Sequence, residues 1–378
     1  MAAAEASLKI LMVTPHLPPY QAANALLPHL LGRTLAARGH RVRYLTFGSE
    51  PDSEDVVYVR RRTRRLRATR VPQLLEAAHT WLKVSPLLAA CELVHVHSNT
   101  WINQVAARLA RRRARPYLLT HYGTEIWHHD GKDRRFRELN RRAFHVTFYS
   151  QALLARAREL ALPLPAASVV YPPVADAFAP LPAEARRQIR RRYAPGDGPL
   201  LLNVKRLHPL ADHATLLEAL ARVRRQHPAA TLLIAGSGET EPSLRAQAAR
   251  LELAQSVRFL GLVPNEEIAQ LQAAADVFVL SSLLEATPTV AVEALACGTP
   301  VISTDNPGGL ELRSLFGDDV TVVSRRDPEA LAAAASTFLA APRRTRAATA
   351  QLIDGRFRLD GVADRYLELY RAASGGAA

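Results

Sequence analysis

Two glutamates stand eight residues apart in the second half of the chain, on either side of a junction between a loop and a helix. Glu285 lies in the loop after an apolar strand, and Glu293 falls one turn into the helix that Pro288 or Thr289 begins. A helix start offers free backbone N–H groups and the positive end of its dipole, so Thr289 and Val290 could receive a phosphate. Glu293 could then accept hydrogen bonds from a ribose diol, and Glu285 could bind hydroxyls of an attached hexose.

Each of these residues also has an ordinary structural explanation. Glu285 alone could be a solvated loop residue, and Glu293 alone could be a capping-type glutamate. The joint arrangement fits those explanations poorly, and it favours a site for a sugar nucleotide.

The elements that position these residues alternate regularly along the chain. In the first half, an apolar run at Lys9–Thr14 precedes a helical pattern at Ala25–Arg38 that stops at Gly39, and Arg41–Phe47 follows as a strand. This is a βαβ unit with a parallel sheet. Further expected elements are strands at Leu93–His97, Tyr117–Thr120 and Ala143–Tyr149 and helices at Trp101–Arg113 and Gln151–Leu160.

The second half repeats the alternation, which predicts an α/β fold with one doubly wound, Rossmann-like sheet in each half. Strands are expected at Leu200–Val204, Thr231–Ala235, Val257–Leu260, Val277–Leu280 and Val301–Ser303, and helices at Ala214–Gln226, Pro242–Leu251, Glu266–Ala274, Thr289–Ala296, Leu331–Leu339 and Gly361–Ala373. The six prolines of Leu162–Pro182 indicate a linker between the two halves. The expected domains are residues 1–175 and 176–358, with a last helix at 360–375 that could cross back to the first.

Length and composition agree with two globular domains. The chain has 378 residues, of which 48% are hydrophobic, and no apolar run is long enough to span a membrane. Cys91 and Cys297 are far apart in apolar contexts, so we expect core thiols in a reducing cytosol rather than a disulfide.

The positive charge is concentrated in the first half. Residues 1–175 hold 26 lysines and arginines against 12 acidic residues, which accounts for the whole net charge of +14. This asymmetry indicates an anionic partner, either a membrane surface or an acidic acceptor, although an arginine-rich coding preference is a competing explanation. The run Arg60–Arg70 contains seven arginines, and a solvated surface is its favoured interpretation. No aromatic interleaving accompanies the charge, so nucleic-acid binding is not expected.

The spacing of Glu285 and Glu293 resembles the E-x7-E signature of the retaining GT-B glycosyltransferases of family 4. The resemblance covers nearly the whole chain and rests on the order of several individually weak motifs. In sequence order they are Thr120–Glu125 (THYGTE), Val170–Phe178, Asn203–Leu207 (NVKRL), Ile234–Gly238 (IAGSG), Val257–Pro264 and Ala275–Ser282. The resemblance implies two Rossmann-like lobes that face each other across a cleft, the first for the acceptor and the second for the donor.

The resemblance also implies a role for each matched residue. Glu293 would bind the ribose, and Glu285 would bind the donor sugar. Arg206 would neutralise the charge that develops on the leaving diphosphate, without a metal or other cofactor. His121 would reach the donor sugar from the other lobe, although a histidine at a strand end is otherwise most often a core residue. The implied catalytic residues are His121, Glu285 and Arg206, and the implied donor site comprises Arg206, Gly236, Gly238, Val263, Glu285, Thr287, Pro288, Thr289, Val290 and Glu293.

The chain departs from the family pattern at two places. The family usually has a lysine five residues after the arginine, and here that position is Ala211, so either His208 or His213 supplies the second positive group or the diphosphate is held less tightly. The family also has a Gly-Gly pair in the first loop, which is replaced by Ala22 and Ala23 before Asn24. Two methyl groups narrow the approach of backbone to ligand, which implies a different acceptor or weakened activity.

The sequence therefore predicts a retaining glycosyltransferase that moves a hexose or N-acetylhexosamine from a UDP- or GDP-sugar to a hydroxyl acceptor. The basic first half favours a lipid-linked or anionic acceptor over a soluble secondary metabolite, in the cytoplasm or peripherally on the inner face of the membrane. Two alternatives stay open: an epimerase or phosphorylase-like enzyme on the same fold, and a non-catalytic protein that binds nucleotide sugars.

Overall fold

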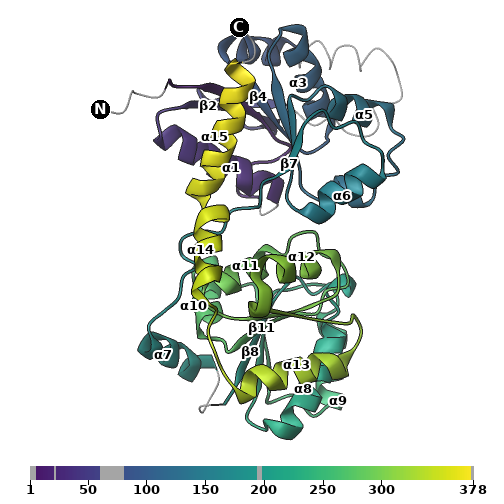
Figure 1. Cartoon of the computed structure of the whole chain (residues 1–378), viewed down its shortest axis with the longest axis vertical. Coiled ribbons are helices and arrows are strands. Elements are labelled where there is room, and N and C mark those ends of the chain that lie inside the picture. The colour runs from purple at the N-terminus through teal and green to yellow at the C-terminus, as the bar shows by residue number, and fades with distance from the viewer. Residues whose placement is uncertain (1–5, 21–22, 60–80, 194–197, 376–378) are drawn as a thin grey trace. The chain divides into compact units, whose positions relative to one another are not determined.

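The structure, a computed structural model, describes residues 6–20, 23–59, 81–193 and 198–375 (Figure 1). The arginine run at 60–70 lies outside these residues. The chain divides into two compact units. Unit 1 comprises Met1–Pro173 and Leu359–Ala378, and unit 2 comprises Val174–Arg358.

Unit 1 contains a seven-stranded parallel sheet in the order β3-β2-β1-β4-β5-β6-β7. Its strands are short, and all five residues of both β4 and β5 are buried, because helices cover both faces of such a sheet. The strands are β1 (Lys9–Val13), β2 (Arg41–Phe47), β3 (Val56–Val59), β4 (Leu93–His97), β5 (Tyr117–His121), β6 (His145–Phe148) and β7 (Ala167–Val169).

The last helix of the chain completes the core of unit 1. Val362, Tyr366 and Tyr370 of α15 (Leu359–Gly375) are buried against residues of the central strands, and Arg38 pairs with both Asp360 and Asp364. Further helices of this unit are α1 (Ala23–Ala37), α3 (Trp101–Arg112), α4 (Thr124–Trp127), α5 (Arg134–Arg141) and α6 (Gln151–Glu159), and residues 81–90 are helical as well.

Unit 2 contains a six-stranded parallel sheet in the order β10-β9-β8-β11-β12-β13. Its strands are β8 (Leu200–Val204), β9 (Thr231–Ala235), β10 (Val257–Gly261), β11 (Val277–Leu280), β12 (Val301–Thr304) and β13 (Val320–Val323). Its helices are α7 (Ala183–Tyr193), α8 (His213–Gln226), α9 (Glu241–Arg250), α10 (Asn265–Ala274), α11 (Thr289–Ala296), α12 (Pro307–Phe316), α13 (Pro328–Ala340) and α14 (Ala347–Arg356), with short 3₁₀ turns at Pro209–Ala211 and Gly317–Asp319.

The predicted fold class, two Rossmann-like α/β sheets, is confirmed. The segment expected to be only a linker nevertheless contains β7, the outermost strand of the first sheet, at Ala167–Val169. The strands β3 and β13 and the helices α4, α5, α7, α12 and α14 were not expected from the sequence pattern. Both cysteines are free and buried, as expected. Within the described residues, no helix has the length and apolar character needed to cross a membrane.

Candidate functional site

The strand order of unit 2 reverses between β8 and β11, which pair in parallel through Leu201 and Val277. From this point the chain proceeds outward in one direction through β9 and β10, and in the other through β12 and β13. Loops that leave the carboxyl ends of two such central strands diverge to opposite faces of the sheet, and the crevice between them is where doubly wound folds bind ligands. The loops after β8 and β11 carry Arg206 and Glu285, respectively.

These two loops are joined by hydrogen bonds and an ion pair. The amide of Leu283 donates to the carbonyl of Leu210 at 2.8 Å, and the hydroxyl of Ser281 donates to the carbonyl of Ala211 at 2.8 Å. Nζ of Lys205 lies 2.5 Å from Oε1 of Glu285. The structure therefore places a cation and a carboxylate in direct contact at the strand reversal. Lys205 was not a predicted site residue.

The loop that carries Glu285 is also held from β12 and α12. Nδ2 of Asn306 donates to the carbonyl of Ser282 at 3.0 Å, and the amide of Gly308 donates to the carbonyl of Glu285 at 3.0 Å. A Cβ atom at Gly308 would stand 2.9 Å from Cδ of Pro288, so only glycine fits there without displacement. The sequence signal for this support is Asn-Pro-Gly-Gly at 306–309, a helix start with an Asn cap, and it was overlooked.

Helix α11 begins at Thr289, as predicted, and its first turn has no side-chain cap. The amides of Ala291 and Val292 bond to the carbonyl of Pro288, whereas those of Thr289 and Val290 have no partner within the described residues. Two N–H groups are therefore available at the positive end of the helix dipole. Thr287 immediately precedes this turn.

Glu293 lies one turn into α11 with its carboxylate unpaired among the described residues. Burial raises the pKa of this group to about 7, because a carboxylate loses hydration there without gaining a compensating charge. A donor such as a diol would stabilise the ionised form. The predicted glutamates thus differ: Glu285 has a cationic partner, and Glu293 has none.

The predicted glycine turn after β9 packs directly on the loop after β8. Gly236 has φ of +143°, and a Cβ atom at that position would lie 2.0 Å from the carbonyl oxygen of Lys205. A Cβ atom at Gly238 would lie 2.1 Å from the carbonyl oxygen of Leu207. These glycines therefore set the position of the β8 loop. Val263 follows β10 and is half-buried at the same edge of the sheet.

Arg206, His208 and His213 are the basic side chains nearest to Ala211 in the sequence. The side chain of Arg206 is 72% exposed and lies 3.3 Å from Glu239, and His208 lies 3.5 Å from the same carboxylate. His213 is buried and donates from Nε2 to Oδ1 of Asn203 at 2.9 Å. Burial, helped by the charge of Lys205, lowers the pKa of His213 to about 4, so the alternative in which His213 supplies a positive charge is wrong.

In unit 1, His121 ends β5 with its ring fully buried. Its Nε2 lies 2.9 Å from Oδ1 of Asn140, its Nδ1 lies 3.6 Å from Glu125, and Phe136 and Phe148 contact the ring. The ring is therefore enclosed within unit 1, as in a core histidine. Its predicted role toward a donor sugar stays a prediction. Because the ring is enclosed, the backbone of His121 at the end of β5 is the part of the residue that could contact a ligand.

The predicted acceptor loop is only partly described. Ala22 lies outside the described residues, and Ala23 begins α1. The hydroxyl of Thr14 donates to the carbonyl of Asn24, whose own Oδ1 is buried without a partner among the described residues. This loop follows β1, next to the strand reversal between β1 and β4 of the first sheet. Its role in binding an acceptor stays a prediction. The described residues include no cluster of three or more His, Cys, Asp or Glu side chains able to hold a metal.

Both units match family models of glycosyltransferases. Residues 28–175 match the glycosyl transferase 4-like domain, and residues 185–351 match glycosyl transferases group 1. Together these two segments account for most of the chain. The chain belongs to the GT-B glycosyltransferases.

Relatives of this GT-B chain include more than one kind of glycosyltransferase. It is 35% identical over 210 residues to a GDP-mannose-dependent alpha-(1-6)-phosphatidylinositol monomannoside mannosyltransferase of Mycolicibacterium smegmatis, a match that covers 53% of this chain and 54% of the relative. It is 36% identical over 181 residues to a D-inositol 3-phosphate glycosyltransferase of Segniliparus rotundus, covering 46% of this chain and 40% of the relative. The chain thus spans about half the length of the curated relatives that it matches.

Solved structures share the fold over nearly the whole length. Anabaena Alr3699/HepE in complex with UDP superposes with a TM-score of 0.78 at 20% identity, covering 97% of this chain and 100% of the other. Sucrose-phosphate synthase from Thermosynechococcus elongatus gives a TM-score of 0.74 at 21% identity, with coverage of 98% and 100%. At these identities the likeness establishes the GT-B fold alone.

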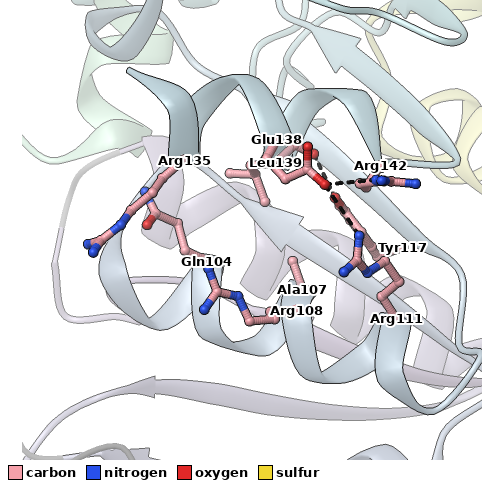
Figure 2. A pocket seen from close by; sticks show the side chains of 9 residues that line it. All are labelled: Gln104, Ala107, Arg108, Arg111, Tyr117, Arg135, Glu138, Leu139 and Arg142. Atoms are coloured by element: carbon pink, nitrogen blue, oxygen red, sulfur yellow. Dashed lines mark hydrogen bonds and ion pairs between the residues drawn. The ribbon is translucent and has the colours of Figure 1, made fainter.

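Unit 1 of this GT-B chain also has a groove between α3 and α5 (Figure 2). Four arginines line it: Arg108, Arg111, Arg135 and Arg142. Glu138 is the acidic residue among them, and it lies 2.8 Å from Arg142 and 3.3 Å from Arg111. Arg108 and Arg135 have no ion-pair partner within the described residues, so the groove keeps a positive charge. This groove shares no residue with the predicted catalytic and donor sites.

Proposed function

We propose that this chain is a retaining glycosyltransferase that moves a hexose or N-acetylhexosamine from a UDP- or GDP-sugar to a hydroxyl acceptor. The observation that carries the proposal is the arrangement at the strand reversal of unit 2. An uncapped helix start, an unpaired Glu293 within that helix and a paired Glu285 in the preceding loop meet at one edge of the sheet. A phosphate, a ribose diol and a sugar are the groups that these features match.

Each part of the donor would have its own partners in unit 2. The diphosphate would accept hydrogen bonds from the amides of Thr289 and Val290 and from Arg206, whose exposed guanidinium is free to move toward it. The ribose hydroxyls would donate to Glu293, and the base would lie near Val263.

The chemistry would rest on charge stabilisation of the leaving diphosphate. Arg206 and the helix start would stabilise the negative charge that develops when the bond to the sugar breaks, without a metal or another cofactor. We propose that the acceptor hydroxyl attacks from the face that the diphosphate leaves, so that no protein nucleophile is needed. We also propose that the backbone of His121 in unit 1 takes part in the reaction.

A screen of nucleotide sugars by thermal shift tests the proposal, because a ligand that binds the folded state raises the unfolding temperature. UDP- or GDP-sugars should stabilise the protein, and a Glu293→Ala variant should lose that effect. The absence of both binding and hydrolysis with the whole panel would refute it. Sugar isomerisation without any acceptor would favour an epimerase. Cleavage by inorganic phosphate would favour a phosphorylase-like enzyme, and binding without turnover would favour a non-catalytic protein.

The arginine-lined groove favours an acceptor at a membrane surface over a soluble one. We propose that unit 1 binds peripherally to anionic lipid headgroups on the cytoplasmic face, where each arginine near the surface contributes about 1 kcal/mol. Vesicles with anionic lipid should co-sediment the protein at low salt, and an Arg108→Glu/Arg135→Glu variant should reduce binding strongly.

The matched control for the groove is Arg225→Glu/Arg250→Glu, the same charge change at exposed positions of unit 2. This control should bind vesicles nearly as the unaltered protein does. Equal binding by both double variants would exclude the groove as the contact, and no vesicle binding at low salt would point to a soluble acceptor.

A further inference from the structure

Lys205 occupies the position directly after β8, at the strand reversal of unit 2. Its ammonium lies 2.5 Å from Glu285, and the two side chains are only 30% and 12% exposed. It is the only lysine in the second half of the chain, where arginine is otherwise used as the basic residue. Both charges of this short ion pair are largely shielded from water, so forming it costs desolvation free energy. A functional role for the pair would explain why that cost is tolerated.

The backbone around Lys205 is firmly placed. Its amide donates to the carbonyl of Ala235 at 3.0 Å, and its carbonyl oxygen abuts Gly236, where a Cβ atom would lie 2.0 Å away. On the strand before it, Nδ2 of Asn203 donates to the carbonyl of Val279 at 2.8 Å. The stem of Lys205 therefore starts from a fixed point, and its four-carbon chain allows the ammonium to move.

The neighbouring turn has no side chain with a permanent positive charge, and its His208 lies 3.5 Å from the carboxylate of Glu239. Ala211 is buried, with 4% exposure, and its carbonyl accepts a hydrogen bond from Ser281. His213 is neutral at pH 7, as shown above. Arg206 and Lys205 are thus the permanently charged cations of the loop after β8. Arg325 also reaches the loop of Glu285, through the carbonyl of Leu283 at 3.4 Å, but its guanidinium is paired with Asp305 at 2.8 Å.

We propose that Lys205 is the second diphosphate-binding cation of this chain and that it exchanges partners when the donor binds. Without donor, Lys205 neutralises Glu285. With donor, the ammonium turns to the diphosphate oxygens, and the released carboxylate accepts hydrogen bonds from the hexose hydroxyls. One lysine then replaces the cation missing at Ala211, and it prepares Glu285 for the sugar. This inference rests on the proposed function, because it concerns the same donor.

Isothermal titration with UDP and GDP, and separately with uridine and guanosine, tests the exchange. Lys205→Ala should weaken diphosphate binding by about tenfold to a hundredfold, as expected for one hydrogen bond to a charged group, and should leave nucleoside binding unchanged. Lys205→Arg should retain part of the affinity. Glu285→Gln should bind UDP or GDP as tightly as the unaltered protein or more tightly, because Lys205 no longer has to leave a carboxylate.

A purely structural ion pair would behave differently. In that case Lys205→Ala and Glu285→Gln would weaken diphosphate and nucleoside binding together, and this result would overturn the inference. Diphosphate binding by Lys205→Ala equal to that of the unaltered protein would overturn it too. Arg222→Ala, which removes an exposed ion pair with Glu218 on α8, is the control and should change no affinity. If the unaltered protein binds neither diphosphate nor nucleoside, the proposed function itself fails.

Discussion

The hydroxyl of Tyr370 lies 2.7 Å from Nδ1 of His95, which joins the last helix of the chain to the central strand β4. The other ring nitrogen of His95 lies 2.7 Å from the hydroxyl of Thr120, so both nitrogens have partners. Burial lowers the pKa of His95 to about 3, and the ring is therefore neutral. The C-terminal helix thus supplies a polar group that a buried ring of unit 1 requires.

Tyr370→Phe should destabilise unit 1, because it leaves one nitrogen of His95 without a partner while the volume changes little. The expected loss in the free energy of unfolding is about 1–3 kcal/mol, measured by denaturant titration. Tyr20→Phe, at a side chain that is 60% exposed, is the control and should have almost no effect. Equal effects of both substitutions would contradict the role of α15 in this core.

Glu293 should make the stability of unit 2 depend on pH. Its pKa in the folded protein, about 7, is above the ordinary value of 4.5, so the folded state binds the proton more tightly. The free energy of unfolding should therefore fall as pH rises from 4.5 through 7 and stay level above that range. Glu293→Gln should match the unaltered protein near pH 4.5 and be more stable at pH 8, by about 2–3 kcal/mol.

Thermal and denaturant unfolding at several pH values measure this difference. Glu252→Gln, at an exposed carboxylate, is the control. Under the proposed function, the affinity for UDP or GDP should also increase between pH 6 and pH 8, because an ionised Glu293 is the better acceptor for the ribose hydroxyls. This increase should disappear in Glu293→Gln.

Gly236→Ala should destabilise unit 2 severely. The added methyl group would meet the carbonyl oxygen of Lys205 at 2.0 Å, and the φ of +143° is unfavourable for alanine. We expect a loss of about 2 kcal/mol or more in the free energy of unfolding. Gly355→Ala is the matched control, since nothing lies within 4 Å of an added Cβ on helix α14, and it should be neutral or stabilising.

Arg206→Ala should weaken the binding of UDP or GDP while leaving the free energy of unfolding almost unchanged. The side chains of Arg206 and Glu239 are 72% and 50% exposed, and exposed pairs of this kind contribute little to folding. Titration with UDP or GDP should nevertheless show about tenfold weaker binding, if Arg206 contacts the diphosphate. Unchanged affinity would remove Arg206 from the proposed site.

Much of the architecture could be predicted from local patterns. The bounds of β2, β4, β8, β9, β11 and α11 agree with the sequence expectation, because short apolar runs and helix-period spacing are local signals. The strand β7 was missed since the prolines around it were interpreted as breakers of regular structure. Its three residues pair only along one edge, with β6.

The candidate site was harder to predict, because its contacts depend on strand order. Lys205 and Glu285 are 80 positions apart in sequence, and they meet only because β8 and β11 are neighbours at the strand reversal. No local pattern distinguishes this lysine from a surface residue. Likewise, the burial of His121 depends on packing against Phe136 and Phe148, which belong to other elements.

The chain passes between the two units twice, and the two passages are paired where unit 2 starts and ends. The amide of Val174 donates to the carbonyl of Phe357 at 2.6 Å, and Arg358 donates to the carbonyls of Ala175 and Phe178. In gene terms, unit 2 is an uninterrupted insert with adjacent ends, whereas unit 1 is encoded in two pieces. A single proteolytic cut at either passage would still leave unit 2 covalently joined to one piece of unit 1, so complete separation of the units requires two cuts.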